Sequence, residues 1–221
     1  MTLSPAGRVT LPPGRRAVLY ALRRRGEAGV EELAEQLQMT HSGVRQHLNV
    51  LSEEGLVEAV EEDPPSPRRG RRTLRYSVTP EADHLFPKAY GELTNELLGY
   101  LDDADPTLLA SLFERRREHR IAGARAHLEP LDGLGARVAE LARILDADGY
   151  LAGVEEIAGG YLIVERNCAI WAVAQRYGHA CVSELEFIQA ALPEAEVRRV
   201  AHLVAGARQC AYEVTPRVAA G

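Results

Sequence analysis

Hydrophobic positions in the first quarter of the chain follow the period of short amphipathic helices. Two stripes of helical spacing predict a first helix over residues 15–25 and a second helix from residue 30 to about residue 38. The apolar positions are Val18, Leu19 and Leu22 in the first stripe, and Val30, Leu33, Ala34 and Leu37 in the second.

A third helix is expected after Thr40, whose hydroxyl group can cap a helix N-terminus. Val44, Leu48 and Leu51 have the spacing of its inward face. Two short helices joined by about three residues are typical of a helix-turn-helix, in which the second helix enters the major groove of DNA. The positions that we predict to face DNA are Thr40, Ser42, Arg45, Gln46 and Asn49.

The residues after the third helix have the pattern of a hairpin wing. Residues 56–60 alternate as a strand, and residues 73–78 predict a returning strand. The proline- and arginine-rich segment 63–72 between them cannot hold regular structure. Arginines there can engage phosphates or the minor groove, so we predict DNA contacts by Arg68, Arg69, Arg71 and Arg72. We therefore predict a winged helix-turn-helix domain over residues 12–79.

The middle of the chain, residues 80–130, is predicted to be helical. Thr79 and Pro80 favour a helix start, Pro87 interrupts it, and a long arginine-rich helix is expected from Thr107 to about Leu128. Operators are usually pseudo-palindromic, so we expect a homodimer and interpret this segment as linker and dimerisation helices.

The last part, residues 131–216, predicts a small α/β domain, which makes the whole chain α+β. Trp171 is interpreted as core packing, and His179 and His202 as surface or core residues rather than ligands. The expected elements are a helix over 131–145, strands over 150–158 and 161–165, helices over 169–177 and 182–192, and a strand over 209–214.

The three cysteines of the chain all lie in this domain, as Cys168-x12-Cys181-x28-Cys210. Three thiols cannot pair internally without leaving one over, so metal or redox chemistry is the functional interpretation. Three unrelated buried cysteines are the alternative, because no short Cys-x2-Cys motif is present. Cys168 and Cys181 precede predicted helices, whose N-termini stabilise thiolates.

Composition narrows the function classes. A net charge of −6 excludes a generally basic nucleic-acid protein, although residues 64–77 hold five arginines and no acidic residue. No apolar run approaches a membrane span and no hydrophobic signal core is present, so we expect a cytoplasmic protein. No phosphate loop, zinc-protease motif or nucleophile elbow occurs, so we do not expect an enzyme.

The chain resembles the SufR-type iron–sulfur-responsive repressors over nearly its whole length. The resemblance is carried by residues 40–56 with Val44-Arg45-Gln46-His47-Leu48, by the wing, by the step at 78–82 and by Glu165-Arg166-Asn167-Cys168. It implies a DNA-binding repressor of the genes for iron–sulfur cluster assembly. It also implies that Cys168, Cys181 and Cys210 hold a cluster, with a 4Fe-4S form favoured over 2Fe-2S.

The family's ligand pattern, Cys-x12-Cys-x13-His-x14-Cys, departs from this sequence at one position, where Ala195 stands in place of histidine. The fourth ligand stays open between Glu194 or Glu196, His179 or His202, a small thiol and water. The alternative function is a winged-helix regulator whose C-terminal domain binds zinc or a small organic effector, or senses oxidants by thiol chemistry.

Overall fold

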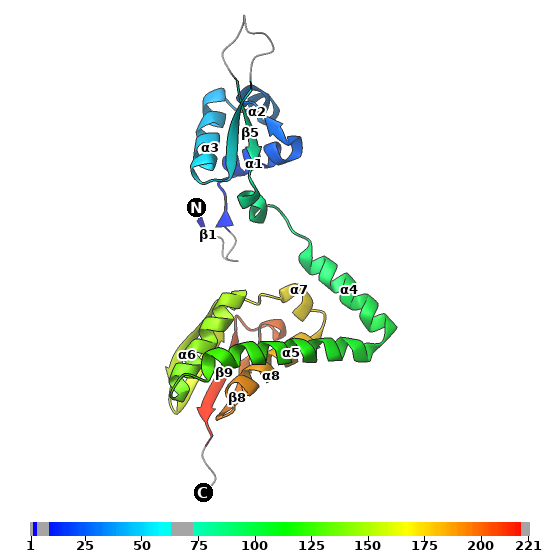
Figure 1. Ribbon diagram of the computed structural model, residues 1–221, viewed down its shortest axis with the longest axis vertical. Helices are drawn as coiled ribbons and strands as arrows, with labels where there is room; N and C mark the ends of the chain where they lie inside the picture. Colours follow the sequence, from blue (N-terminus) through cyan, green and yellow to red (C-terminus); the bar gives the residue numbers. More distant parts are fainter. Residues whose placement is uncertain (1, 4–8, 63–72, 218–221) are drawn as a thin grey trace, which may run out of the picture. The chain divides into compact units, whose positions relative to one another are not determined.

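The computed structural model describes residues 2–3, 9–62 and 73–217. The chain divides into two compact units, Met1–Lys88 and Ala89–Gly221, and each is described by itself (Figure 1). The N-terminal unit contains β1 (Thr2–Leu3), β2 (Val9–Thr10), α1 (Pro13–Arg25), β3 (Glu27–Ala28), α2 (Val30–Leu37), α3 (His41–Glu53), β4 (Val57–Glu62), β5 (Thr73–Val78) and the short 3-10 helix η1 (Pro80–Leu85).

The N-terminal unit is a winged helix-turn-helix, as the sequence predicts. Helices α1 to α3 pack around one apolar core, and the antiparallel strands follow the order β3-β5-β4. The wing strands pair from Val57 with Val78 to Glu62 with Thr73. Strand β3 is too short to show an alternating pattern, and the sequence did not predict it. The core residues include Val18, Leu22, Leu33, Val44, Leu48 and Leu51.

The turn and the ends of α3 follow their local chemistry. Gln38 adopts a left-handed conformation, with φ of 53°, which allows α2 to end and the chain to reverse. Gly55 adopts φ of 71° after α3, a left-handed conformation that glycine takes without strain. Thr79 was expected to cap a helix, but its hydroxyl group donates to the carbonyl of Gly55 at 2.7 Å, and only the short η1 follows.

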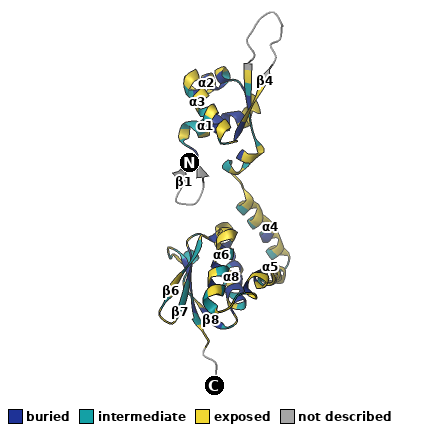
Figure 2. Cartoon of the chain, turned by 60° about the vertical axis from the view of Figure 1, so that its left-hand side comes forward, coloured by how far each residue is buried: buried dark blue, intermediate teal, exposed yellow. Residues whose placement is uncertain are grey.

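The C-terminal unit is a four-stranded antiparallel sheet with helices packed on it. Figures 1 and 2 show α6 and α8 against the sheet, whose strand order is β6-β7-β9-β8. The elements are α4 (Tyr90–Ala104), α5 (Pro106–Leu128), α6 (Leu134–Leu145), the π-turn η2 (Asp146–Tyr150), β6 (Ala152–Ile157), β7 (Gly160–Glu165), α7 (Trp171–Ala174), α8 (Gly178–Ala191), β8 (Ala195–Ala201), the 3-10 turn η3 (Leu203–Ala205) and β9 (Cys210–Pro216).

Three expectations for this unit were wrong. The helix predicted over 169–177 is the single turn α7, and α8 begins at Gly178, so Cys181 lies inside its first turn. Residues 195–201 form β8, which the sequence did not predict. Trp171 is 43% exposed and does not pack in the core.

Two hydrogen bonds join α4 to α7 and to Tyr177, which follows α7. The side-chain amide of Asn95 donates to the carbonyl of Ala172 at 2.8 Å, and the hydroxyl group of Tyr177 donates to the carbonyl of Asn95 at 3.2 Å. At Gly91 the backbone of α4 passes so close that a Cβ would lie 2.7 Å from Ala172 Cβ. The segment that follows Cys168 is therefore held by α4.

Helix α5, expected as a linker or dimer helix, contributes to the core of the C-terminal unit. Leu109, Phe113 and Leu128 are buried, and Arg120 extends toward α8. Within the described ranges, no helix is both long and apolar enough to span a membrane.

Candidate nucleic-acid interface and thiol pocket

The residues predicted to face DNA lie on the exposed side of α3. These five residues are exposed, whereas Val44, Leu48 and Leu51 on the opposite face of the helix are buried in the core. The exposed residues are Thr40, Ser42, Arg45, Gln46 and Asn49. The helix therefore presents hydrogen-bonding side chains along one face, as a recognition helix in the major groove requires.

The N-terminus of α3 is fixed by Thr40. Its Oγ1 accepts the backbone N–H of Gly43 at 3.1 Å and lies 3.2 Å from the hydroxyl oxygen of Ser42. Arg45 Nη2 lies 3.7 Å from Glu31 Oε1 on α2, and both side chains are well exposed. An exposed pair of this kind holds the guanidinium weakly, so Arg45 is available for DNA.

His47, on the same helix, has a packing role. A Cβ at Gly14, at the start of α1, would lie 2.6 Å from His47 Nε2. The imidazole thus fills the contact between α1 and α3.

The wing arginines Arg68, Arg69, Arg71 and Arg72 lie outside the described residues, and their DNA contacts stay a prediction. Arg75, at the described base of the wing, pairs with Glu27 at 3.0 Å and with Glu32 at 3.2 Å. This fifth arginine therefore links the base of the wing to β3 and α2.

Three thiols that are distant in sequence line one pocket of the C-terminal unit. Cys168 follows β7, Cys181 lies in the first turn of α8, and Cys210 is the first residue of β9. The empty volume is about 280 Å³, including solvent at the mouth. The lining is Tyr150, Glu165, Cys168, Ile170, Ala174, Ala180, Cys181, Glu184, Arg199, His202, Cys210 and Tyr212.

Sheet register brings two of these thiols together. Glu165, the last residue of β7, pairs directly with Cys210, so the chain leaves the sheet toward Cys168 beside the start of β9. The following turn is fixed by Asn167, which donates its backbone N–H to Tyr150 at 3.0 Å and its side-chain amide to Gly149 at 2.7 Å. The thiol of Cys210 accepts the backbone N–H of Leu203 at 3.4 Å.

Two buried carboxylates lie in the same pocket, and the sequence analysis missed both. Glu165 is 2% exposed and Glu184 is 4% exposed. Glu184 accepts hydrogen bonds from Arg120 at 2.7 Å and from Tyr150 at 2.9 Å. Glu165 accepts a long one, at 3.4 Å, from Tyr212. A signal existed for Glu184, because it stands three residues after Cys181 on a helix and shares its face.

Some buried polar atoms of this pocket have no protein partner. Among the described residues, the second oxygens of Glu165 and Glu184 and the Nε of Arg199 are buried without a hydrogen bond. Burying such groups costs free energy unless something else satisfies them. Burial and the neighbouring Glu184 carboxylate raise the pKa of Glu165 to about 8.

The thiols are not pre-ionised, contrary to the expectation from helix N-termini. Burial raises the pKa of Cys168 to about 11 and also raises the pKa of Cys181 and of Cys210. The helix that follows Cys168, α7, is a single turn, and burial is the largest cause of the raised pKa of Cys168. Metal binding at these thiols would therefore release protons.

Among the four side chains considered as a fourth ligand, only His202 lines the thiol pocket. Glu194 pairs with Arg137 at 2.8 Å, Glu196 is exposed, and His179 is exposed and stacks on Phe113. His202 is half-buried and lines the thiol pocket.

The His202 ring is held beside Arg199. Its Nε2 lies 3.5 Å from Arg199 Nη1. Burial and, to a smaller extent, the charge of Arg199 lower the pKa of His202, so the neutral imidazole is favoured. Neutral imidazole is the form that binds metals. Within residues 9–62 and 73–217, no group of three or more His, Cys, Asp or Glu is arranged to hold a single metal ion.

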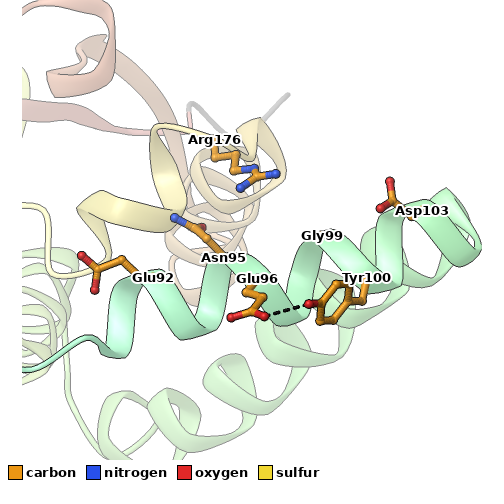
Figure 3. A pocket seen from close by; sticks show the side chains of 7 residues that line it. All are labelled: Glu92, Asn95, Glu96, Gly99, Tyr100, Asp103 and Arg176. Atoms are coloured by element: carbon orange, nitrogen blue, oxygen red, sulfur yellow. Dashed lines mark hydrogen bonds between the residues drawn. The ribbon is translucent and has the colours of Figure 1, made fainter.

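A second hollow lies along α4 and has different chemistry (Figure 3). Its empty volume is about 720 Å³, and Arg176 faces the acidic side of the helix across it. Tyr100 donates to Glu96 at 2.7 Å within it. The lining is Glu92, Asn95, Glu96, Gly99, Tyr100, Asp103 and Arg176, which includes neither a thiol nor an imidazole.

Comparison with known proteins supports the assignment of the N-terminal domain as a helix-turn-helix domain. Residues 12–59 match the family described as bacterial regulatory protein, arsR family. No match to a curated protein was found. The chain is therefore a DNA-binding transcription regulator of the winged-helix type.

Similarity to solved structures is partial. YusO from Bacillus subtilis is 21% identical, with 48% of this chain and 73% of that chain covered and a TM-score of 0.31. A MarR family transcriptional regulator from Silicibacter pomeroyi is 21% identical, with 49% and 69% covered and a TM-score of 0.31. PadR from Bacillus subtilis, in complex with operator DNA, is 16% identical, with 57% and 80% covered and a TM-score of 0.31.

Proposed function

We propose that the protein is a homodimeric repressor of iron–sulfur cluster assembly genes, and that a cluster held by Cys168, Cys181 and Cys210 gates its DNA binding. The observation that carries the proposal is the meeting of these three thiols in one pocket. The sequence resemblance to SufR-type repressors points to the same residues. A [4Fe–4S] cluster is favoured over a [2Fe–2S] cluster.

The donor set fits such a group. Thiolates are the usual ligands of iron–sulfur clusters, and hydrogen bonds to their sulfurs tune the cluster's potential. The backbone N–H of Leu203 already points at Cys210, and that of Ile170 at Cys168. Unpartnered polar atoms of Glu165 and Arg199 border the same space. When bound, the cluster would supply a link between β7, α8 and β9 that depends on iron and oxidants.

Loss of that link would affect α4 and α5, because the segments that carry Cys168 and Cys181 contact these two helices. Cys168 leads directly into α7, which Asn95 fastens to α4. Cys181 lies on α8 three residues before Glu184, which Arg120 of α5 binds. A change in the spacing of the thiols would therefore move the contacts of both helices.

An exposed apolar stripe on α4 and α5 supports the homodimer. Figure 2 shows much of α4 as exposed, and its large apolar side chains recur at helical spacing. The stripe is Tyr90, Leu93, Leu97, Tyr100 and Leu101 on α4, with Leu108 and Leu112 on α5. A symmetric dimer would bury this stripe and pair two winged helices for the half-sites of an operator.

The test is anaerobic reconstitution followed by DNA titration. Wild-type protein should take up iron and sulfide and become brown, whereas each of Cys168→Ser, Cys181→Ser and Cys210→Ser should lose the colour. Duplexes selected separately by apo- and holo-protein from a random library should bind the two forms with affinities at least about tenfold apart, or about 1.4 kcal/mol of coupling. Non-specific binding should stay nearly unchanged.

Two outcomes would contradict the proposal. A colourless protein that binds zinc would make the site a metal site of another kind. Equal affinities of apo- and holo-protein for every selected duplex would leave the cluster without a gating role.

A further inference from the structure

Besides the three thiols, the pocket is lined by three side chains of metal-binding type, His202, Glu165 and Glu184. Tyr150 and Tyr212 also line it, but their hydroxyl groups donate to the two carboxylates. The identity of the fourth ligand decides how firmly the cluster is held and at what potential it works.

Glu184 is committed to other partners. One of its oxygens accepts hydrogen bonds from both Arg120 and Tyr150, and Arg120 also donates to Asp148 at 2.9 Å. Its other oxygen has no hydrogen-bond partner among the described residues, but moving the carboxylate toward the thiols would break the buried bonds from Arg120 and Tyr150.

Glu165 is less engaged, but its position and chemistry suit it poorly. It is the last residue of β7 and pairs with both Cys210 and Ala152, so its backbone cannot move without breaking strand pairs. Carboxylates prefer hard cations such as Mg²⁺ and Ca²⁺, whereas imidazole suits iron.

His202 has the opposite properties. It lies between β8 and η3, outside the paired strands, and its neighbour Leu203 donates to the Cys210 sulfur. Its ring is half-buried in the pocket wall, with Nε2 turned to Arg199 at 3.5 Å. A small change of this loop therefore moves the imidazole without disturbing the sheet.

The register of β8 shows why position 195, where the resembled family has its histidine ligand, is badly placed to bind the cluster. Ala195 pairs with Pro216, and Ala201 pairs with Ala211 beside Cys210. Residue 195 is thus at the far end of the strand, whereas residue 202 follows the end that borders the thiols. We propose that His202, through a ring nitrogen, is the fourth ligand of the cluster; this inference rests on the proposed function.

The test is pulsed electron paramagnetic resonance on the reduced, reconstituted protein. Histidine labelled with ¹⁵N in the imidazole ring separates ring nitrogens from backbone amides. We expect a strong ¹⁵N hyperfine coupling in the wild type. The coupling should disappear in His202→Ala and His202→Cys, and persist in His179→Ala, whose ring is exposed and outside the pocket.

Two further variants keep the test decisive. His202→Cys should retain iron and sulfide and show a lower reduction potential, because a thiolate replaces a neutral imidazole. Glu165→Gln should keep the nitrogen coupling if its fold and metal content are intact. Circular dichroism of each apo-variant checks that the domain still folds.

The outcomes separate the two proposals. A wild-type protein with bound iron and sulfide but no imidazole coupling would overturn the assignment of His202 alone. Coupling that persists in His202→Ala would do the same and point to another histidine. Failure of the wild type to take up iron and sulfide would remove the cluster itself, and His202 with it.

Discussion

Arg45 illustrates how a base-reading side chain can be held ready at the surface. Its side chain is 59% exposed, and its guanidinium lies 3.7 Å from the carboxylate of Glu31, whose side chain is 66% exposed. Such a pair contributes at most about 1 kcal/mol and is screened by salt. The pair therefore orients Arg45 along α3 without preventing its transfer to a base edge.

Replacement of Arg45 or Gln46 tests direct readout. Arg45→Ala or Gln46→Ala should cost about 1 to 3 kcal/mol on the specific operator and little on random duplex DNA, because a base-edge hydrogen bond is lost. Fluorescence anisotropy titrations with both DNAs measure the difference. Equal losses on the two DNAs would reassign the residue to the phosphate backbone.

The same residue scale shows where sequence reasoning stops. The exposed positions of α3 follow from helical period alone, and the structure agrees. The burial of Glu165 and Glu184 does not follow from the sequence pattern, because carboxylates are usually exposed. Their partners, Tyr212 for Glu165 and Arg120 for Glu184, lie far away in sequence. Spacing identified three thiols, and only the fold brought His202 beside them.

At the scale of elements, β8 shows a second limit. Burial alternates along the whole of β8, but the residue types follow that alternation only in its first half. Arg199 takes an inward position, whereas the apolar Val200 is 52% exposed. The hydrophobic alternation by which a strand is predicted is therefore missing from the second half of β8. The helices of the winged domain have no such interruption, so their prediction was confirmed.

Two glycines of the C-terminal unit should respond in opposite directions. A Cβ at Gly160 would lie 2.2 Å from the backbone oxygen of Val214, so Gly160→Ala should destabilise the fold by about 1–3 kcal/mol. A Cβ added at Gly123, inside α5, would meet no atom within 4 Å, so Gly123→Ala should stabilise the fold by about 1 kcal/mol. Urea unfolding of the apo-protein measures both. Similar midpoints for the two variants would contradict the close approach of β7 and β9.

The wing can be tested through its salt dependence. If Arg68, Arg69, Arg71 and Arg72 contact phosphates, replacing two of them with alanine should weaken binding to every duplex and reduce the salt slope by about 0.9 per lost contact. Arg198→Ala, an exposed arginine of β8, is the matched control and should leave the slope unchanged. A slope unaffected by the wing substitutions would show that these arginines remain solvated.

At the scale of the whole molecule, the apolar stripe on α4 and α5 should decide the oligomeric state. Leu97→Glu places a charge in the stripe, so the protein should shift from dimer to monomer and lose affinity for a palindromic duplex. Sedimentation velocity measures the mass. Val200→Glu, at a similarly exposed apolar position on β8, should remain dimeric. A dimeric Leu97→Glu variant would place the interface elsewhere.

Helix α7 has a consequence for hydrogen exchange. A helix of one turn is not stable by itself in water, so its backbone hydrogen bonds persist only while Asn95 and Tyr177 hold it to α4. The amide hydrogens at the end of α7 should therefore exchange through local opening, long before those of β7 and β9. Their exchange rate becomes a direct measure of how often α7 separates from α4.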